Sequence, residues 1–254
     1  MKWTIIPLLA LASFAHADAF TDKRWIHGSK DCATNRDPPI ETFEVDADTY
    51  LLRQNKCVHF EAPFIYVLFG KDTVFIQDTG ATAEAEKFPL YDTVRNLIAR
   101  RGVRGMKILV THSHSHHDHK AADGQFRGKP GVTIVEPTPA GVRAYFKFND
   151  WPNGEAVIDL GGRTLIVQPA PGHQDEALIV YDSRTRWLLT GDSVLPGRLY
   201  VYAKDWNTFR ASVRKMVLFT ETHRVPAVMG THIELSKTGK QYPAGATYQP
   251  DEAS

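Results

Sequence analysis

The stretch THSHSHHDHK, residues 111–120, carries five histidines and one aspartate within eight positions. The apolar run before it, residues 106–110, is typical of a buried strand, and the two alanines after it can open a helix. A strand that ends in imidazoles and a carboxylate at the start of a loop is where a metal site is usually built. A surface polyhistidine tract is the alternative, but it would not follow a buried strand with a single aspartate before its last histidine. The stretch therefore predicts metal binding.

Only one register of this cluster fits a motif with two metal sites. His114, His116, Asp118 and His119 match the pattern H-x-H-x-D-H, whereas the register that begins at His112 has a histidine where its aspartate should stand. His114 and His116 point the same way from an extended turn and can share one ion. Asp118 and His119 are adjacent and point apart, so they suit a second ion close by.

The motif H-x-H-x-D-H is the defining motif of the metallo-β-lactamase superfamily, which this chain therefore resembles. The resemblance spans roughly residues 60–235. It implies an α/β fold, a four-layer αβ/βα sandwich in which two mixed β-sheets are flanked by helices. His112 and His117 fall outside the motif, and we expect them to lie behind the ligands or on the surface.

The composition is that of an ordinary globular protein. Its 254 residues are 43% hydrophobic and 23% charged, which is enough chain for one sizeable domain. The formal net charge of +1 gives no argument for binding to nucleic acid or to an anionic membrane. We expect a small-molecule substrate as the partner, while the oligomeric state stays open.

The first residues have the features of a signal peptide, residues 1–17. A short basic start precedes an apolar stretch that is too short to span a membrane, and Ala15-His16-Ala17 is a cleavage site of the A-x-A type. The mature chain, residues 18–254, would be one domain exported to the periplasm or secreted, with no stable membrane insertion. An uncleaved membrane anchor is the alternative.

Two cysteines, Cys32 and Cys57, lie in the N-terminal part, away from every metal motif. In an exported protein we expect one disulfide between them, which would pin the N-terminal segment, residues 18–59. Two free buried thiols are the alternative.

The runs of apolar residues alternate between strand and helix patterns. Strands are predicted at residues 42–45, 64–69 and 73–77, with a hairpin turn between the last two. Apolar residues at helical spacing over residues 90–101 lead into the strand before the histidine cluster, a β-α-β unit. Asp78 ends the third strand; it is either an ordinary turn residue or, as the resemblance implies, a residue that orients a ligand histidine.

The second half continues the same pattern. We predict strands and helices in the following order: a strand at 132–135, a helix from Thr138 to about 148, a hairpin over 156–168, strands at 177–181 and 187–189, a helix capped by Asp205, and a strand at 226–229. Three ligand-type residues follow strand ends here: His173, Asp192 and His232.

The resemblance assigns these residues to two metal ions. His114, His116 and His173 would hold the first ion. The second ion would be held by three further side chains: Asp118, His119 and His232. Asp192 would bridge both ions. Ligation by nitrogen and oxygen suits two Zn²⁺ ions, and Mn²⁺ or iron would also accept these donors.

Such a site predicts a hydrolase that attacks an acyl carbon with a metal-bound hydroxide, which Asp118 would orient. The bridging Asp192 resembles the lactonases and the glyoxalase II thioesterases, because the best-known β-lactamases of the family have cysteine or serine there. His116 stands where the di-iron flavoproteins have glutamate, which argues against an oxygen-reducing role. The substrate could be a lactone, ester, thioester or β-lactam. A phosphodiesterase and a non-catalytic metal-binding protein are the alternatives.

Contacts to the substrate are predicted only from position. Ser193, Arg198, Tyr200 and Tyr202 follow the bridging aspartate and could line the mouth of the site, where Arg198 could hold a carboxylate. A solvated loop with packed aromatic rings is the alternative. The sequence assigns no function to residues 237–254.

Overall fold

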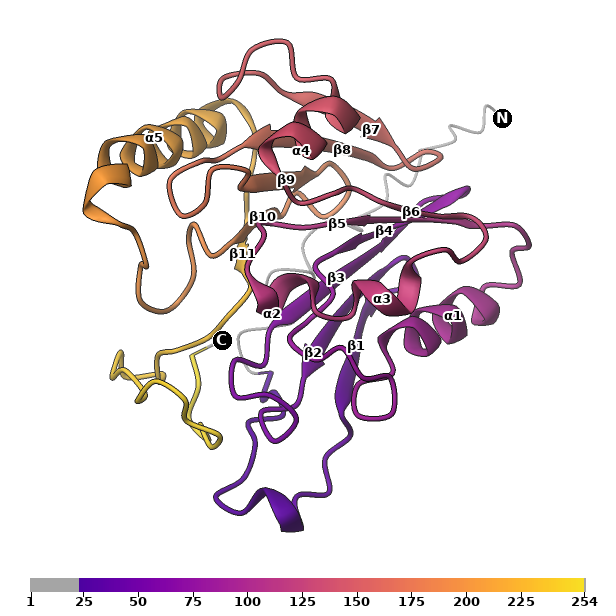
Figure 1. Ribbon diagram of the computed structural model, residues 1–254, viewed down its shortest axis with the longest axis vertical. Helices are drawn as coiled ribbons and strands as arrows, with labels where there is room; N and C mark the ends of the chain where they lie inside the picture. Colours follow the sequence, from indigo (N-terminus) through magenta and orange to yellow (C-terminus); the bar gives the residue numbers. More distant parts are fainter. Residues whose placement is uncertain (1–22, 254) are drawn as a thin grey trace, which may run out of the picture.

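The structure is a computed structural model of the chain and describes residues 23–253. Two mixed β-sheets pack face to face, and helices cover their outer faces (Figure 1). This is the α/β sandwich that the sequence predicts. The predicted signal peptide, residues 1–17, and the predicted start of the mature chain lie outside the described residues.

The first sheet has six strands in sequence order. They are β1 (Ile40–Asp46), β2 (Thr49–Gln54), β3 (Phe64–Phe69), β4 (Thr73–Gln77), β5 (Lys107–Thr111) and β6 (Val132–Ile134). The first four strands pair antiparallel, and β5 and β6 add to β4 in parallel. Because parallel neighbours need a crossover, α1 (Leu90–Arg100) connects β4 to β5, as the β-α-β pattern predicts.

The second sheet has five strands in the order β11-β10-β9-β8-β7. Their bounds are β7 (Ala156–Asp159), β8 (Thr164–Pro169), β9 (Leu178–Asp182), β10 (Leu188–Gly191) and β11 (Val228–Gly230). Only β10 and β11 pair in parallel. The crossover between them carries a short 3-10 helix, η2 (Ala203–Asp205), followed by α5 (Trp206–Thr222), which covers the outer face of this sheet (Figure 1).

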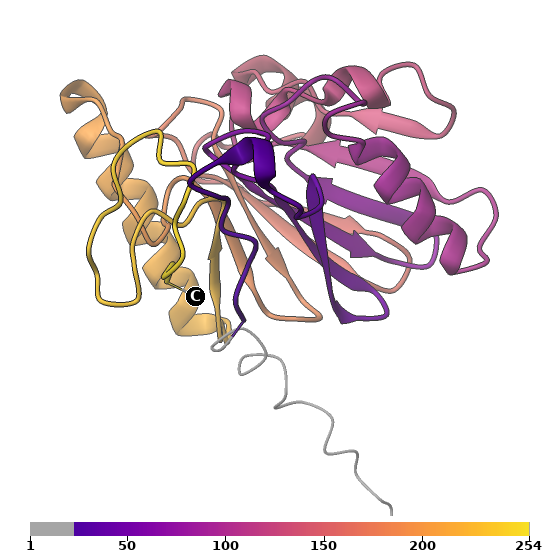
Figure 2. The ribbon, with the colours of Figure 1, turned by 90° about the horizontal axis from the view of Figure 1, so that it is seen from below.

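Alternation along the strands divides the interior into layers. In β3, Tyr66 and Leu68 face the second sheet, whereas Ile65 and Val67 face α1 on the other side. Both faces are therefore buried, which is why this strand is a continuous apolar run in the sequence. Figure 2 shows α1 and α5 on opposite outer sides of the paired sheets.

The remaining α-helices of the described chain are short: α2 (His117–Lys120), α3 (Asp123–Phe126) and α4 (Pro139–Phe146). Thr138 caps α4 as predicted, because its side chain accepts a hydrogen bond of 3.0 Å from the Gly141 amide. Asp205 stands at the N-cap position of α5 as predicted, but its side chain makes no capping hydrogen bond; it is also the last residue of η2.

The N-terminal and C-terminal parts of the described chain lie side by side (Figure 2). Cys32, in the 3-10 helix η1 (Cys32–Thr34), forms the predicted disulfide with Cys57. The C-terminal segment, defined here as residues 234–253, pairs with the residues before η1, since the Ser29 amide donates to the Thr247 carbonyl at 3.1 Å. No helix within residues 23–253 is long and apolar enough to cross a membrane.

Candidate metal centre

The seven predicted ligands come together at one end of the sandwich, where strands of both sheets end. The histidine cluster follows β5, His173 follows β8, Asp192 follows β10 and His232 follows β11. Strands that end at the same edge deliver their following residues to one place, which is how positions more than a hundred residues apart in the sequence become neighbours.

Three imidazoles form the first group. His114 Nε2 lies 2.9 Å from His116 Nδ1, and His173 Nε2 lies 3.2 Å from both of these atoms. Three ring nitrogens cannot all hydrogen-bond to one another, because a neutral imidazole has one donor and one acceptor. A cation that accepts all three lone pairs satisfies this arrangement, so the group could hold one metal ion.

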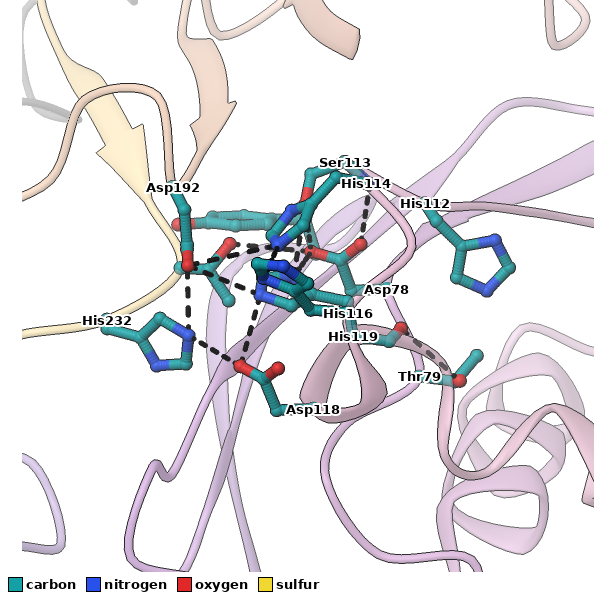
Figure 3. A network of polar contacts seen from close by, with 12 residues as sticks. Asp78, Thr79, His112, Ser113, His114, His116, Asp118, His119, Asp192 and His232 are labelled. Atoms are coloured by element: carbon teal, nitrogen blue, oxygen red, sulfur yellow. Dashed lines mark hydrogen bonds and ion pairs between the residues drawn. The ribbon is translucent and has the colours of Figure 1, made fainter. Parts of the chain in front are cut away.

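The second group combines two imidazoles with two carboxylates. Asp118 Oδ2 lies 3.0 Å from His232 Nε2 and 3.2 Å from His119 Nε2. Asp192 completes the group, with carboxylate oxygens 3.6 Å from each of the same two imidazole nitrogens. Figure 3 shows Asp118, His119, Asp192 and His232 facing a common point.

Asp192 lies between the two groups. Its Oδ2 is 4.0 Å from His114 Nε2 and 3.8 Å from His173 Nε2, so the same carboxylate reaches toward the first group. Within the described residues, Asp192 Oδ1 and His119 Nε2 are buried without a hydrogen-bond partner. Such orphaned atoms cost stability unless a ligand satisfies them, and a shared metal position would do so.

Hydrogen bonds on the outer sides of the histidine rings leave the inner nitrogens free to ligate. His173 Nδ1 is 2.6 Å from the Tyr200 carbonyl, and His232 Nδ1 is 3.0 Å from the Glu61 carbonyl. A carbonyl only accepts, so these Nδ1 atoms carry the proton and donate. When the ring is neutral, as ligation of a metal ion requires, each inner Nε2 has a lone pair that points into the site.

Asp78 lies directly beneath the cluster. Its Oδ2 is 3.0 Å from His119 Nδ1, while Oδ1 accepts a hydrogen bond of 2.7 Å from the Ser113 amide. Asp78 has a φ of 69°, a left-handed conformation that is uncommon outside glycine, and these contacts hold it there. The geometry supports the expectation that Asp78 orients a ligand histidine.

The carboxylates of the second group remain ionised at neutral pH. Burial alone would raise the pKa of Asp118, but the adjacent imidazoles of His119 and His232 outweigh it and hold the pKa well below its usual value. Burial likewise opposes ionisation of Asp192, and the charges of His232 and His119 lower its pKa well below the ordinary range. Both side chains are therefore anionic donors suited to a cation.

Two glycines allow the ligand loops to approach closely. Gly191, with a φ of 56°, lies against Ser113, and a Cβ built there would meet the Ser113 Cβ at 2.4 Å. Gly172, with a φ of 136°, lies against the backbone of Phe209, 2.4 Å from the position its Cβ would take. Each glycine precedes a predicted ligand, so a side chain at either position would displace Asp192 or His173.

The two histidines outside the motif have different environments. His112 is buried, and its Nε2 lies 2.8 Å from Asp123 Oδ1, an oxygen that also accepts a hydrogen bond of 2.8 Å from the Thr79 hydroxyl. In Figure 3 the His112 ring points away from the ligand cluster. His117 is exposed. The sequence identified both as extra residues but gave no signal for the contact between His112 and Asp123.

A cavity of about 450 Å³ opens over the two groups. Arg198, Tyr200 and Tyr202 line it, as predicted from their position after Asp192. The expectation for Ser193 is wrong, because this residue is buried and does not line the cavity. Arg198 is not free to bind a carboxylate, since its guanidinium lies 3.4 Å from Glu234 Oε2.

The donors present fit a pair of divalent transition-metal ions. All ligand-type atoms are imidazole nitrogens or carboxylate oxygens, they lie within 4.8 Å of one another in each group, and two of them are buried orphans. Nitrogen and oxygen donors suit zinc, manganese and iron alike, so the donor set does not determine the ion.

Comparison with known proteins agrees with this geometry. The family model described as the metallo-beta-lactamase superfamily matches residues 60–227. Among solved structures, the metallo-beta-lactamase from Pontibacter korlensis is similar, with a TM-score of 0.56 and 18% identity over 76% of this chain and 91% of that one. The metallo-beta-lactamase from Hirschia baltica is similar at a TM-score of 0.55 and 13% identity, over 77% and 91% of the two chains.

A third solved structure, of TMB-1, has a TM-score of 0.55 and 18% identity, with coverage of 77% of this chain and 90% of that one. At these identities the likeness shows the fold alone. A search of curated proteins found no match to this chain.

Proposed function

The chain belongs to the metallo-β-lactamase superfamily, and from that premise we propose that it is an exported hydrolase with two zinc ions that cleaves an acyl bond. The substrate would be a lactone, ester, thioester or β-lactam. One observation carries the proposal: two groups of ligand-type atoms lie next to each other, with Asp192 of the second group facing the first, at the bottom of a cavity large enough for a small molecule.

The seven proposed ligands fall into three sets by the ion that each would contact. His114, His116 and His173 would hold one ion. A second ion would be held by Asp118, His119 and His232. Asp192 would contact both ions. Two bound divalent cations supply a water that ionises near neutral pH and an electrophile for the carbonyl oxygen of the substrate.

Asp118 is the proposed catalytic residue. It lines the cavity, and its Oδ2 lies 3.0 Å from His232 Nε2 and 3.2 Å from His119 Nε2. Its carboxylate would accept a hydrogen bond from the attacking water, orient it toward the acyl carbon and carry its proton to the leaving group. Both cysteines are in the disulfide, and the sequence contains no G-x-S-x-G motif, so neither a free thiol nor the serine of such a motif competes with this role.

Asp192 favours lactones and thioesters among the acyl substrates. The proposal carries over the ligand pattern of the lactonase and glyoxalase II type, in which an aspartate bridges. Export would exclude glutathione thioesters, which belong to the cytosol. The Cys32–Cys57 disulfide supports export, because disulfides persist in oxidising compartments.

The test is chelator-sensitive turnover on a panel of substrates. The mature chain would be stripped with a chelator, reloaded with zinc, manganese or iron, and assayed on a lactone, a nitrophenyl ester, a thioester and a chromogenic β-lactam. We expect turnover of at least one acyl substrate with reloaded protein and none with stripped protein, together with about two ions per chain by elemental analysis.

The matched control is His117→Ala, which removes an exposed histidine from the same cluster. It should behave as the parent protein does, whereas His119→Ala should lose turnover. Activity confined to a nitrophenyl phosphodiester would instead identify a phosphodiesterase. Bound metal without turnover on any substrate would identify a non-catalytic metal-binding protein.

A further inference from the structure

The side of the cavity away from the ligands is built mainly by the C-terminal segment. Residues 242–246 and Gln249 line it there, together with Phe60 and Lys56 from the N-terminal half. The family model ends at residue 227, so this segment lies outside the matched region. Its contacts decide what part of a substrate can extend away from the metal centre.

Glu234 forms an ion pair with the guanidinium of Arg198. Its Oε2 accepts a hydrogen bond of 2.7 Å from the Arg198 backbone amide and lies 3.4 Å from Arg198 Nη1. The other arm of the guanidinium, Nη2, donates to the Tyr242 carbonyl at 2.5 Å. Both contacts come from the C-terminal segment, so Arg198 offers no free charge to a substrate.

Glu252 pairs with the two other cations on this side of the cavity, Arg53 and Lys56. It forms a two-armed ion pair with Arg53, which is fully buried, with 2.8 Å between Arg53 Nη2 and Glu252 Oε1. Lys56 Nζ lies 3.6 Å from the same oxygen and donates to the Phe60 carbonyl at 3.2 Å. Burial and the neighbouring charge of Arg53 lower the pKa of Lys56 to about 8.

Each cation on this side of the cavity therefore has a carboxylate partner. Among residues 23–253, Lys56 and Arg198 are the lysine and arginine side chains that line the cavity, and Arg53 lies behind them. Two carboxylates pair with these three cations: Glu234 with Arg198, and Glu252 with both Arg53 and Lys56. Most of the remaining lining is apolar or aromatic, including Phe60, Tyr200, Tyr202, Ile233 and Tyr242.

We propose that the C-terminal segment makes this cavity selective for acyl substrates that are uncharged away from the bond to be cleaved. Glu234 and Glu252 neutralise the cations that would otherwise attract an anionic substrate, and residues 242–246 provide a wall without charge. The inference rests on the proposed hydrolytic function and narrows it. Neutral lactones and esters should be preferred over β-lactams that carry a carboxylate.

The test compares two substrates that differ in one charge. 4-Nitrophenyl hexanoate and the mono-4-nitrophenyl ester of adipic acid have acyl chains of similar length, and only the second ends in a carboxylate. With zinc-loaded protein we expect kcat/KM for the hexanoate to exceed that for the adipate by about tenfold, the size of a unit-charge effect in largely aqueous surroundings. Spontaneous hydrolysis of each ester is subtracted.

Variants locate the origin of the preference. Glu234→Gln frees Arg198 and should reduce the preference for the hexanoate about tenfold. The double variant Glu234→Gln with Arg198→Gln should restore it, because the freed cation is gone. Asp251→Asn is the matched control, since this exposed carboxylate lies in the same segment and does not line the cavity.

A second readout does not depend on turnover. Calorimetric titration with N-phenylhexanamide and its carboxylate analogue should show the same preference and the same shift in Glu234→Gln. Preserved binding preference without turnover of either ester would overturn the hydrolytic function and support the charge selectivity. Equal affinity for both amides, or no response to Glu234→Gln, would overturn the charge selectivity itself.

Discussion

The two sides of the cavity meet opposite physical demands. On the metal-centre side, ligand-type atoms crowd together, and Asp192 Oδ1 and His119 Nε2 are buried without hydrogen-bond partners in the described chain. On the opposite side, the C-terminal segment joins its charged residues into pairs, such as Glu252 with Arg53. On the first side, polar atoms lack partners and are held in place by the rest of the fold. On the second side, the charged groups are paired and help to stabilise that fold.

The difference teaches where stability and chemistry separate in this protein. Buried polar side chains without hydrogen-bond partners destabilise a folded chain. A site that contains them therefore depends on favourable packing in other parts of the protein. Here the sheets and the paired C-terminal segment provide that packing. Substitutions on the two sides should therefore have opposite consequences for activity and for the free energy of unfolding.

The largest effect should come from Asp192→Ala. Removing the carboxylate that faces both ligand groups should lower kcat/KM by about a thousandfold or more, since metal ions contribute several kcal/mol to such reactions. The free energy of unfolding of the metal-free protein should fall by less than the loss of about 3–5 kcal/mol expected for a broken buried ion pair, because Asp192 Oδ1 has no hydrogen-bond partner. Ester turnover and urea denaturation measure the two quantities. A large loss of stability would contradict the comparison.

On the opposite side, Glu252→Ala should act mainly on stability. It leaves Arg53 buried without its partner, and breaking a buried ion pair in this way costs about 3–5 kcal/mol. Urea denaturation of the zinc-loaded protein would measure the loss, while the number of bound ions should stay the same. Asp251→Ala is the control and should change the free energy of unfolding by less than about 0.5 kcal/mol.

The disulfide should have a slightly smaller effect of the same kind. Cys32 and Cys57 are separated by 25 positions, and closing a loop of this size stabilises by about 3 kcal/mol. We expect Cys32→Ser with Cys57→Ser to lose this amount while keeping its metal affinity, and reductant to reproduce the loss in the parent. If reductant also lowered the stability of the double variant, the effect would not be due to this disulfide.

The smallest effect, Asp78→Asn, separates the two ligand groups. Asp78 contacts His119, a member of the second group, so its substitution should weaken one metal position about 10–100-fold. Competition with a chromophoric chelator can resolve the two binding steps. Asp123→Asn is the control, because Asp123 contacts His112 and no proposed ligand. Equal weakening of both steps would mean that Asp78 supports the whole site.

Much of the fold was predictable because its strands are marked in the local sequence. The apolar runs 64–69 and 73–77 coincide with β3 and β4, since both faces of these strands are buried. β2 was not predicted. It includes Arg53 and Gln54, polar residues whose burial depends on distant partners, Glu252 in one case and Thr82 in the other. Periodicity cannot reveal such a strand.

The candidate site shows the same division. His173, Asp192 and His232 could be selected because each follows a strand, and a strand end is recognisable from local sequence. The contact between His112 and Asp123 could not be anticipated, because nothing local distinguishes a buried histidine from an exposed one such as His117. The burial of Ser193 could not be anticipated either, because nothing local distinguishes a buried serine from one that lines a cavity.

The sequence by itself determined the family, most of the strands and the identities of seven ligand-type residues, because these depend on patterns within a few neighbouring positions. Only the tertiary structure decided that the C-terminal segment lines the cavity and that its carboxylates meet Lys56 and Arg198. The reason is physical: hydrophobic periodicity is a local property of the chain. The pairing of charges depends instead on distance in space, and the path of the whole backbone sets that distance.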